Sequence, residues 1–145
     1  MTVPEPREAA LRRAGLALAR RARSEAELAR SLGSVAPPEV VSGVLADLRA
    51  LGYLDDAALA RALAERRLAS GWGALRVRAD LERLEVAGEP ARAGIELAEA
   101  GERESAAGLL AARRLEDDPR RAAALLARRG FGEETVESLV APGFD

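Results

Sequence analysis

Apolar residues recur along this chain every three or four positions, which is the spacing of one face of an α-helix. Leu11, Gly15 and Leu18 follow this spacing near the start, and Leu59 and Leu63 follow it further along. No segment alternates apolar and polar residues as a half-buried strand does, and β-branched residues are few. The pattern predicts an all-α protein.

One short motif occurs three times, at offsets of 46 and 47 residues. The copies are ALARR at 17–21, LAERR at 63–67 and LAARR at 110–114. Each copy is followed after three residues by Ser24, Ser70 or Asp117, whose side chains can accept hydrogen bonds from the N-terminus of a following helix. The motif therefore predicts a tandem repeat in which a second helix begins near residues 24, 73 and 119.

The repeat predicts three units of three helices each, nine helices in all. The expected organisation is an N-terminal tail at 1–8, then units at 9–54, 55–100 and 101–145. Gly52 and Gly101 are expected to end the last helix of the first and second units. Because a unit of this size buries little apolar surface alone, neighbouring units should pack together into an elongated body that can curve.

The stretch LRALGYLDD, residues 48–56, is predicted to join the first unit to the second. Gly52 ends a helix, Tyr53 and Leu54 pack into the joint, and Asp55 or Asp56 caps the next helix, where its charge suits the helix dipole. The Tyr53 hydroxyl can also face a partner. Further structural roles are expected for Ser24 and Asp118 as caps, Gly130 as a helix stop and Phe131 as a core residue.

Composition leaves little room for catalysis. The 145 residues include no cysteine, histidine or lysine, and all 22 basic residues are arginine. The usual general base, the thiol nucleophile and the best metal ligands are missing, so we expect no enzyme, no cofactor and no metal. The pairs Asp55-Asp56 and Asp117-Asp118 can hold Mg²⁺ in principle, but their place before helices favours capping. With no apolar run long enough to span a membrane, we expect a cytoplasmic protein.

The arginine doublets and the single tryptophan are the candidate binding residues. Arginine forks can meet phosphates or carboxylates, and Trp72 between two glycines can serve as an exposed anchor or fill a seam between units. The alternative for each doublet is a solvated helix face paired with nearby glutamates. The net charge of -2 offers little general attraction to DNA. The candidates are Tyr53, Arg66, Arg67, Trp72, Arg76, Arg78, Arg113, Arg114, Arg128 and Arg129.

Three stretches, taken in order, resemble the RecX family of RecA regulators: LGYLDDAALARALAERR, SGWGALRVRADLERLEVAGEPA and LLARRGFGEETVESLV. The resemblance runs from about residue 10 to the end of the sequence. We expect the protein to be a monomer. The resemblance implies tandem three-helix repeats and binding to the RecA–DNA filament along its helical groove. It further implies lower ATP hydrolysis and strand exchange, with no catalysis by the protein itself.

The chain departs from the family pattern at two places. Leu59 replaces the usual phenylalanine, and Leu84-Glu85 replaces lysine-glycine. Because a left-handed conformation at Glu85 is strained, we expect the helix before it to run on to Gly88. The family's basic surface is also diluted here, so we expect contact with the recombinase protein before contact with bare DNA.

Two other functions remain open at this stage. A helix-turn-helix regulator would read DNA with arginine, asparagine or glutamine near a helix start. The third helices instead begin PPEVVSGV, EPARAGIE and EETVESLV, which are acidic or apolar. A generic helical scaffold for another protein is the second alternative, and only a partner assay separates it from recombinase regulation.

Overall fold

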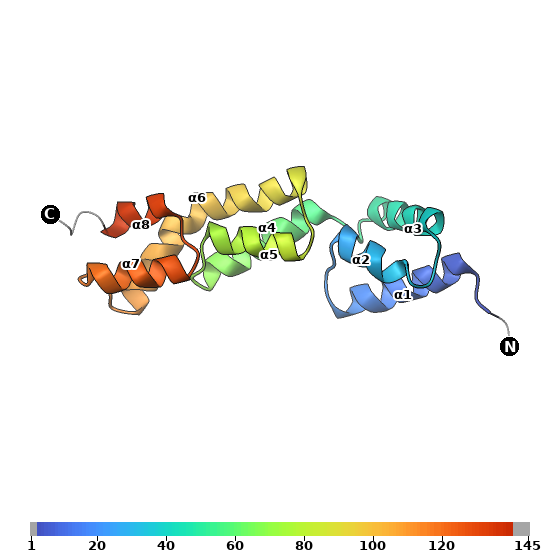
Figure 1. Ribbon diagram of the computed structural model, residues 1–145, viewed down its shortest axis with the longest axis horizontal. Helices are drawn as coiled ribbons and strands as arrows, with labels where there is room; N and C mark the ends of the chain where they lie inside the picture. The colour runs from blue at the N-terminus through green and yellow to red at the C-terminus, as the bar shows by residue number, and fades with distance from the viewer. Residues whose placement is uncertain (1–2, 141–145) are drawn as a thin grey trace.

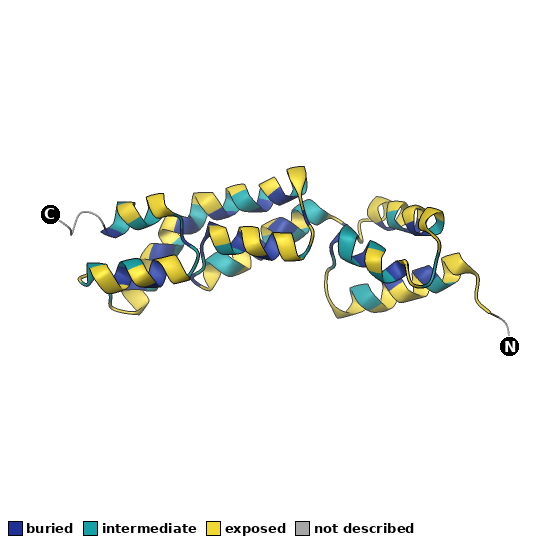
Figure 2. Cartoon of the chain, viewed as in Figure 1, coloured by how far each residue is buried: buried dark blue, intermediate teal, exposed yellow. Residues whose placement is uncertain are grey.

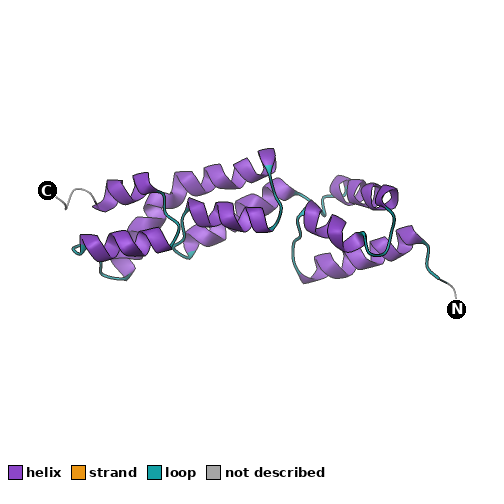
Figure 3. Ribbon diagram, viewed as in Figure 1, coloured by secondary structure: helices purple, strands orange, loops and turns teal. Residues whose placement is uncertain are grey.

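The computed structural model describes residues 3–140, and this range contains eight α-helices and no strand (Figures 1 and 3). The all-α prediction is confirmed. The helices are α1 Pro6–Arg20, α2 Glu25–Leu32, α3 Pro38–Ala50, α4 Asp56–Ala69, α5 Ala74–Arg83, α6 Gly88–Ala112, α7 Pro119–Arg128 and α8 Glu133–Val140. The first helix already begins at Pro6, so the N-terminal tail is shorter than the expected 1–8.

The body is elongated, with α1–α3 at one end and α7 and α8 at the other (Figure 1). Three hydrophobic clusters follow one another along it, and Figure 2 shows the buried positions inside each helix group. Leu28, Val44 and Leu54 lie in the first, Val77 and Leu81 in the second, and the third is built around Leu126 and Phe131. Each cluster takes its residues from helices close in sequence, while the tandem repeat itself stays a prediction.

The expected boundary at residue 100 falls within α6, which runs unbroken for 25 residues. This helix replaces two expected helices, so the described residues hold eight helices instead of nine. Gly101 does not end a helix. A Cβ there would lie 2.8 Å from Leu68 Cδ1, so the glycine admits a side chain of α4 against α6. A glycine inside a long helix looks the same in sequence as one that ends a helix.

Most helix ends share one hydrogen-bonding pattern. At α3, Gly52 has a φ of +85°, and the Tyr53 N–H donates to the Leu48 carbonyl at 2.9 Å. The same bond, from a backbone N–H to the carbonyl five residues earlier, ends α4, α5, α6 and α7. The residue that donates this N–H is apolar in each of these four helices. At α5 the left-handed residue is Glu85, with a φ of +58°, so α5 ends at Arg83. The expectation that this helix continues to Gly88 is wrong.

The turn that contains Glu85 lies at the contact between α2 and α5. Its carboxylate pairs with Arg30 of α2. The Val86 side chain that follows is buried in the second hydrophobic cluster. An apolar residue after the left-handed position is the usual companion of this helix end. The backbone at Glu85 thus takes a conformation that glycine would adopt more easily, with the Val86 side chain buried next to it.

Polar contacts join α1–α3 to the rest of the body. Ser24 caps α2 by accepting the Glu27 N–H at 3.1 Å, and its own hydroxyl donates to the Leu84 carbonyl at 2.6 Å. The Glu25 N–H donates to Asp56 Oδ1 at 3.0 Å. Burial raises the pKa of Asp56, although the hydrogen bond from Glu25 acts in the opposite direction. Asp55 caps α4 by accepting the Ala58 N–H at 3.0 Å.

One expected joint residue lies elsewhere. Leu54 is buried in the first hydrophobic cluster, but Tyr53 is 64% exposed, so its predicted packing into the joint is wrong. The tyrosine occupies the position whose N–H closes α3, and that role uses only its backbone. Its ring remains available for contact with a partner.

Replacing Ser24 with alanine is expected to lower the free energy of unfolding by about 2 kcal/mol, because one change removes an N-cap and a buried hydrogen bond across the joint. Chemical denaturation followed by circular dichroism measures the loss. Ser34→Ala is the matched control, since Ser34 is exposed and bonds only to the Ser31 carbonyl. Equal losses for the two variants would contradict the double role of Ser24.

The second and third clusters are linked by backbone and by one buried carboxylate. The Gly73 N–H donates to the Arg129 carbonyl and the Leu75 N–H to the Gly130 carbonyl, both at 2.9 Å. Glu102, on α6, accepts the Gly132 N–H at 2.8 Å and the Ala74 N–H at 3.4 Å. A single side chain thus binds the N-termini of α5 and α8, where negative charge is favoured.

No helix within residues 3–140 is long and apolar enough to cross a membrane.

Candidate docking site

Trp72 is held in a narrow turn between α4 and α5. The backbone N–H of Trp72 donates to the Arg67 carbonyl at 2.9 Å, and Gly71 before it has a φ of +79°. A Cβ on Gly73 would lie 2.5 Å from the Gly130 carbonyl oxygen, so this position requires glycine. The turn therefore lies directly against the turn between α7 and α8, and the indole is fixed near the end of α7.

Three arginines surround the half-buried indole of Trp72. The guanidinium carbons of Arg76 and Arg129 each lie 4.6 Å from the ring centroid, and that of Arg67 lies at 5.8 Å. Each lies within the range of a cation–π contact, worth about 0.5–1 kcal/mol at exposed sites. Trp72 thus holds three positive charges from α4, α5 and α7 close together. A contact between Trp72 and a partner stays a prediction.

Asp80 is the one carboxylate on this cluster, and it is 3% exposed. Its oxygens accept from Arg67 Nε at 2.6 Å and from Arg76 Nε at 3.1 Å, and it also pairs with Arg83. We call Arg67, Trp72, Arg76, Asp80, Arg83 and Arg129 the arginine–tryptophan cluster. Four arginines against one carboxylate leave this cluster strongly positive, although the whole chain carries a charge of -2.

A hollow of about 400 Å³ adjoins this cluster. Its lining includes Arg21, Arg66, Arg67 and Arg83, with Leu59 and Leu63 as apolar wall. The arginines come from the end of α1, from α4 and from α5, so the hollow spans the joint between α1–α3 and the rest. Arginine side chains beside an apolar surface can bind carboxylate or phosphate groups of a larger partner through paired hydrogen bonds.

In the part of the chain that the structure describes, no group of acidic side chains is placed to hold a metal ion.

Several expected contact residues lie outside the cluster. Arg78 faces α6 and pairs with Glu99 at 3.0 Å, although Arg76 on the same helix belongs to the cluster. Arg113 and Arg114 are exposed at the end of α6, where Arg114 takes the left-handed conformation. Arg128 is exposed beside Arg129, and Tyr53 lies at the end of α3. The structure thus brings together Arg67, Trp72, Arg76 and Arg129, with Arg66 on the adjoining hollow.

Sequence reasoning missed Asp80 and Arg83. The spacing Arg76, Asp80, Arg83 places all three on one side of α5, and this pattern of a carboxylate between two arginines was the available signal. Their contact with Arg67 of α4 is tertiary, and no local pattern reports it.

The remaining residues for which a structural role was expected lie at helix ends or in the core. Asp118 accepts the Arg121 N–H at 3.3 Å, Gly130 has a φ of +76°, and Phe131 is 2% exposed.

Asp80→Asn is expected to lower the free energy of unfolding by about 1–2 kcal/mol, because the amide removes the negative charge from among three arginines. The loss stays moderate since the arginine side chains are 28–65% exposed and can turn toward water. Urea denaturation measures it. Asp47→Asn, which breaks the exposed pair with Arg7, should change stability by less than about 0.5 kcal/mol. An equally small effect at Asp80 would contradict the expected importance of its charge.

The molecule is an elongated all-α protein with arginines clustered around a fixed tryptophan. The chain is 39% identical to the regulatory protein RecX of Deinococcus radiodurans over 142 residues, which cover 93% of this chain and 68% of that protein. It is 33% identical to the regulatory protein RecX of Xanthomonas campestris pv. campestris over 126 residues, 82% of this chain and 78% of the relative. The chain therefore belongs to the RecX family of regulatory proteins.

A solved structure shows the same fold. The crystal structure of RecX from Lactobacillus salivarius matches with a TM-score of 0.81 over 96% of this chain and 97% of that chain, at 15% sequence identity. No family model matches the chain. The relatives confirm the resemblance noted in the sequence, and the solved structure shares the all-α fold.

Proposed function

We propose that this protein binds the RecA–DNA filament and lowers its ATP hydrolysis and strand exchange. The observation that carries the proposal is membership of the RecX family of regulatory proteins over nearly the whole chain. We further propose that it acts as a monomer in the cytoplasm, that its three hydrophobic clusters correspond to three tandem units, and that recombinational repair is the process it modulates.

The shape of the molecule supports a filament as the partner. A filament repeats the same surface at each subunit, and an elongated protein can touch several subunits at once. Contacts on one rigid body reinforce one another, since after the first has formed the second is intramolecular. The backbone bonds between the α4–α5 and α7–α8 turns fix the two halves of the arginine–tryptophan cluster for such contact.

Charge favours protein surface over bare DNA as the first contact. The net charge of -2 gives little long-range attraction to phosphate, and the cluster is one local positive surface. Arginine and tryptophan are the residues that most often dominate protein–protein binding energies. DNA inside the filament can still contribute once the protein is bound.

The two alternative functions have weaker support. A DNA-reading helix needs side chains that recognise bases at its N-terminal end. The helices expected to come third in each unit carry acidic residues in their first turns. These are Glu39 in α3, Glu89 in α6, and Glu133 and Glu134 in α8. A helical scaffold for some other protein would share the fold, and the partner assay separates it from the recombinase regulator.

DNA-dependent ATP hydrolysis by RecA filaments tests the proposal. We expect clear inhibition when this protein is added well below one copy per RecA subunit. No inhibition up to saturation, with circular dichroism showing a folded helical protein, would contradict regulation of RecA and favour a scaffold for another partner.

A further inference from the structure

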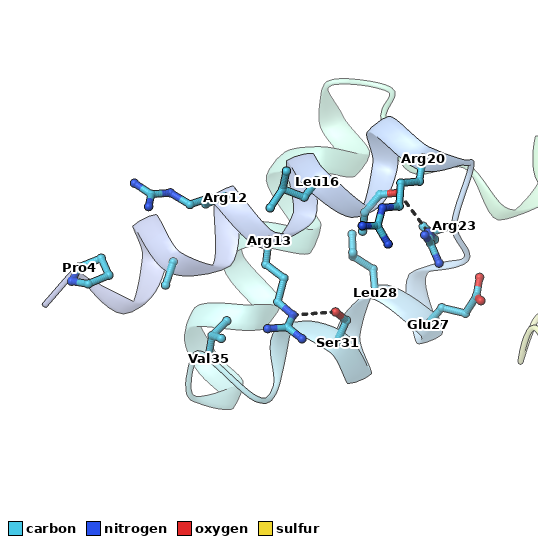
Figure 4. A pocket seen from close by; sticks show the side chains of 12 residues that line it. Pro4, Arg12, Arg13, Leu16, Arg20, Arg23, Glu27, Leu28, Ser31 and Val35 are labelled. Atoms are coloured by element: carbon cyan, nitrogen blue, oxygen red, sulfur yellow. Dashed lines mark hydrogen bonds between the residues drawn. The ribbon is translucent and has the colours of Figure 1, made fainter.

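A second basic surface lies on α1 and α2, toward the opposite end of the body from α7 (Figures 1 and 4). It is a hollow of about 480 Å³. Its lining combines Arg12, Arg13, Arg20 and Arg23 with apolar side chains, and Glu27 is its one acidic residue. We call it the α1–α2 hollow. It shares no lining residue with the hollow beside the arginine–tryptophan cluster.

The arginines of the α1–α2 hollow have few carboxylate partners. Arg13 donates from Nε to the Ser31 hydroxyl at 3.0 Å, and Arg23 donates to the Ala17 carbonyl at 3.2 Å, as Figure 4 shows. Arg12 lies 3.9 Å from Glu8, at the limit of an ion pair. Within residues 3–140, no carboxylate is placed within ion-pair distance of Arg13, Arg20 or Arg23.

Glu27 offsets only part of the positive charge of the four arginines, because its carboxylate is hydrogen-bonded to groups outside them and its charge acts on Arg23 alone among them. It pairs with Arg21 at 2.8 Å and accepts the Ser24 N–H at 3.1 Å. Burial acts to raise the pKa of Glu27, but the hydrogen bonds from Arg21 and Ser24 outweigh it and lower the pKa. The carboxylate therefore favours its ionised form and pairs with Arg21, and one acidic side chain faces four arginines in the hollow.

Apolar side chains lie among the charges of the hollow. Leu16 lies on α1 between the positions of Arg13 and Arg20 and is 67% exposed, whereas Leu28 of α2 is fully buried (Figure 4). Val35 closes the lower side in that view. No aromatic residue lines the hollow, although aromatic stacking is the usual way in which single-stranded bases are held. The surface is therefore suited to carboxylates and an aliphatic side chain on one segment, more than to nucleotides.

We propose that the α1–α2 hollow receives an acidic segment of the partner protein, with one apolar side chain of that segment against Leu16 and its carboxylates on Arg13, Arg20 and Arg23. The inference rests on the proposed function for the identity of the partner, which would be a RecA subunit in the filament. Arginine binds carboxylates through paired donors, which fixes the orientation of the segment. With the arginine–tryptophan cluster, the hollow gives the protein two separated contacts, and each raises the effective concentration of the other.

Site-specific photocrosslinking tests the occupant directly. Leu16→p-benzoylphenylalanine places the crosslinker at the hollow, and Leu51→p-benzoylphenylalanine, at a position that is 71% exposed outside the hollow, is the control. Each protein is irradiated on preformed RecA filaments on poly(dT), and the adducts are identified by mass spectrometry. We expect the Leu16 variant to crosslink to an acidic RecA segment. Adducts with DNA, with a second copy of this chain or with a segment that is not acidic would each overturn the proposal.

Charge reversal distinguishes failure of the inference from failure of the proposed function. Arg13→Glu with Arg20→Glu should weaken filament binding about tenfold or more. The control pair, Arg61→Glu with Arg120→Glu, makes the same charge change at exposed positions outside both hollows and should have a much smaller effect. If wild-type protein binds filaments and the two pairs behave alike, the hollow is not a contact. If wild-type protein does not bind filaments, the proposed function fails.

Discussion

Replacing Gly94 with alanine is expected to lower the free energy of unfolding by about 1–3 kcal/mol. Gly94 lies where α6 packs on α4, and a Cβ there would lie 2.6 Å from the Ala60 carbonyl oxygen and 2.8 Å from the Ala60 Cβ. Because the nearest atoms are backbone, they cannot move aside as a flexible side chain could. The two helices must separate along the contact that forms the second hydrophobic cluster.

The same substitution elsewhere on α6 is expected to have the opposite sign. Nothing lies within 4 Å of a Cβ on Gly108, so Gly108→Ala should stabilise the protein by up to about 1 kcal/mol through helix propensity. Thermal and urea unfolding of both variants, followed by circular dichroism, give the comparison. Stabilisation by both alanines would contradict the close packing of α4 and α6.

Removing Trp72 and Arg129 together is expected to weaken binding to RecA filaments about 30-fold or more, a loss of about 2 kcal/mol. Trp72→Ala takes away the ring that holds Arg67, Arg76 and Arg129 together, and Arg129→Ala removes the charge contributed by α7. The effect should exceed that of truncating any arginine outside the cluster. Equilibrium binding of the double variant to preformed filaments measures it.

Arg128→Ala is the matched control for this variant, because Arg128 is the exposed neighbour of Arg129 on α7 and has no contact with the Trp72 ring among the described residues. Its effect should stay within about twofold. Circular dichroism spectra and melting curves must show that every variant is folded at the assay temperature. An unchanged affinity for a folded Trp72→Ala, Arg129→Ala protein would exclude the arginine–tryptophan cluster as the docking site.

Local signals predicted helix identity and most helix starts. The three- and four-residue spacing of apolar positions predicted an all-α chain, and Ser24 and Asp118 lie at the helix starts that their capping chemistry indicated. The second helices begin at Glu25, Ala74 and Pro119, close to the expected 24, 73 and 119. These features depend on residues near one another in sequence, so pattern reasoning could find them.

Features set by tertiary contact were missed or misread. Gly101 has the residue type of a helix stop, but it lies inside α6, beside Leu68 of α4. Glu85 adopts the left-handed conformation that its side chain disfavours, next to the buried Val86 and paired with Arg30, and both of these contacts are tertiary. Asp80 gathers arginines from two helices, and only the packing of α4 against α5 brings them together.

Binding to a preformed RecA filament tests the central claim most directly. The chain has no cysteine, so a Gly108→Cys variant takes a single fluorophore at an open position. Fluorescence anisotropy would then be measured against RecA assembled on poly(dT) with a non-hydrolysable ATP analogue, against RecA without DNA, and against poly(dT) alone. We predict much tighter binding to the filament than to either component. Equal binding to bare DNA, or no binding to the filament by a folded protein, would contradict the account.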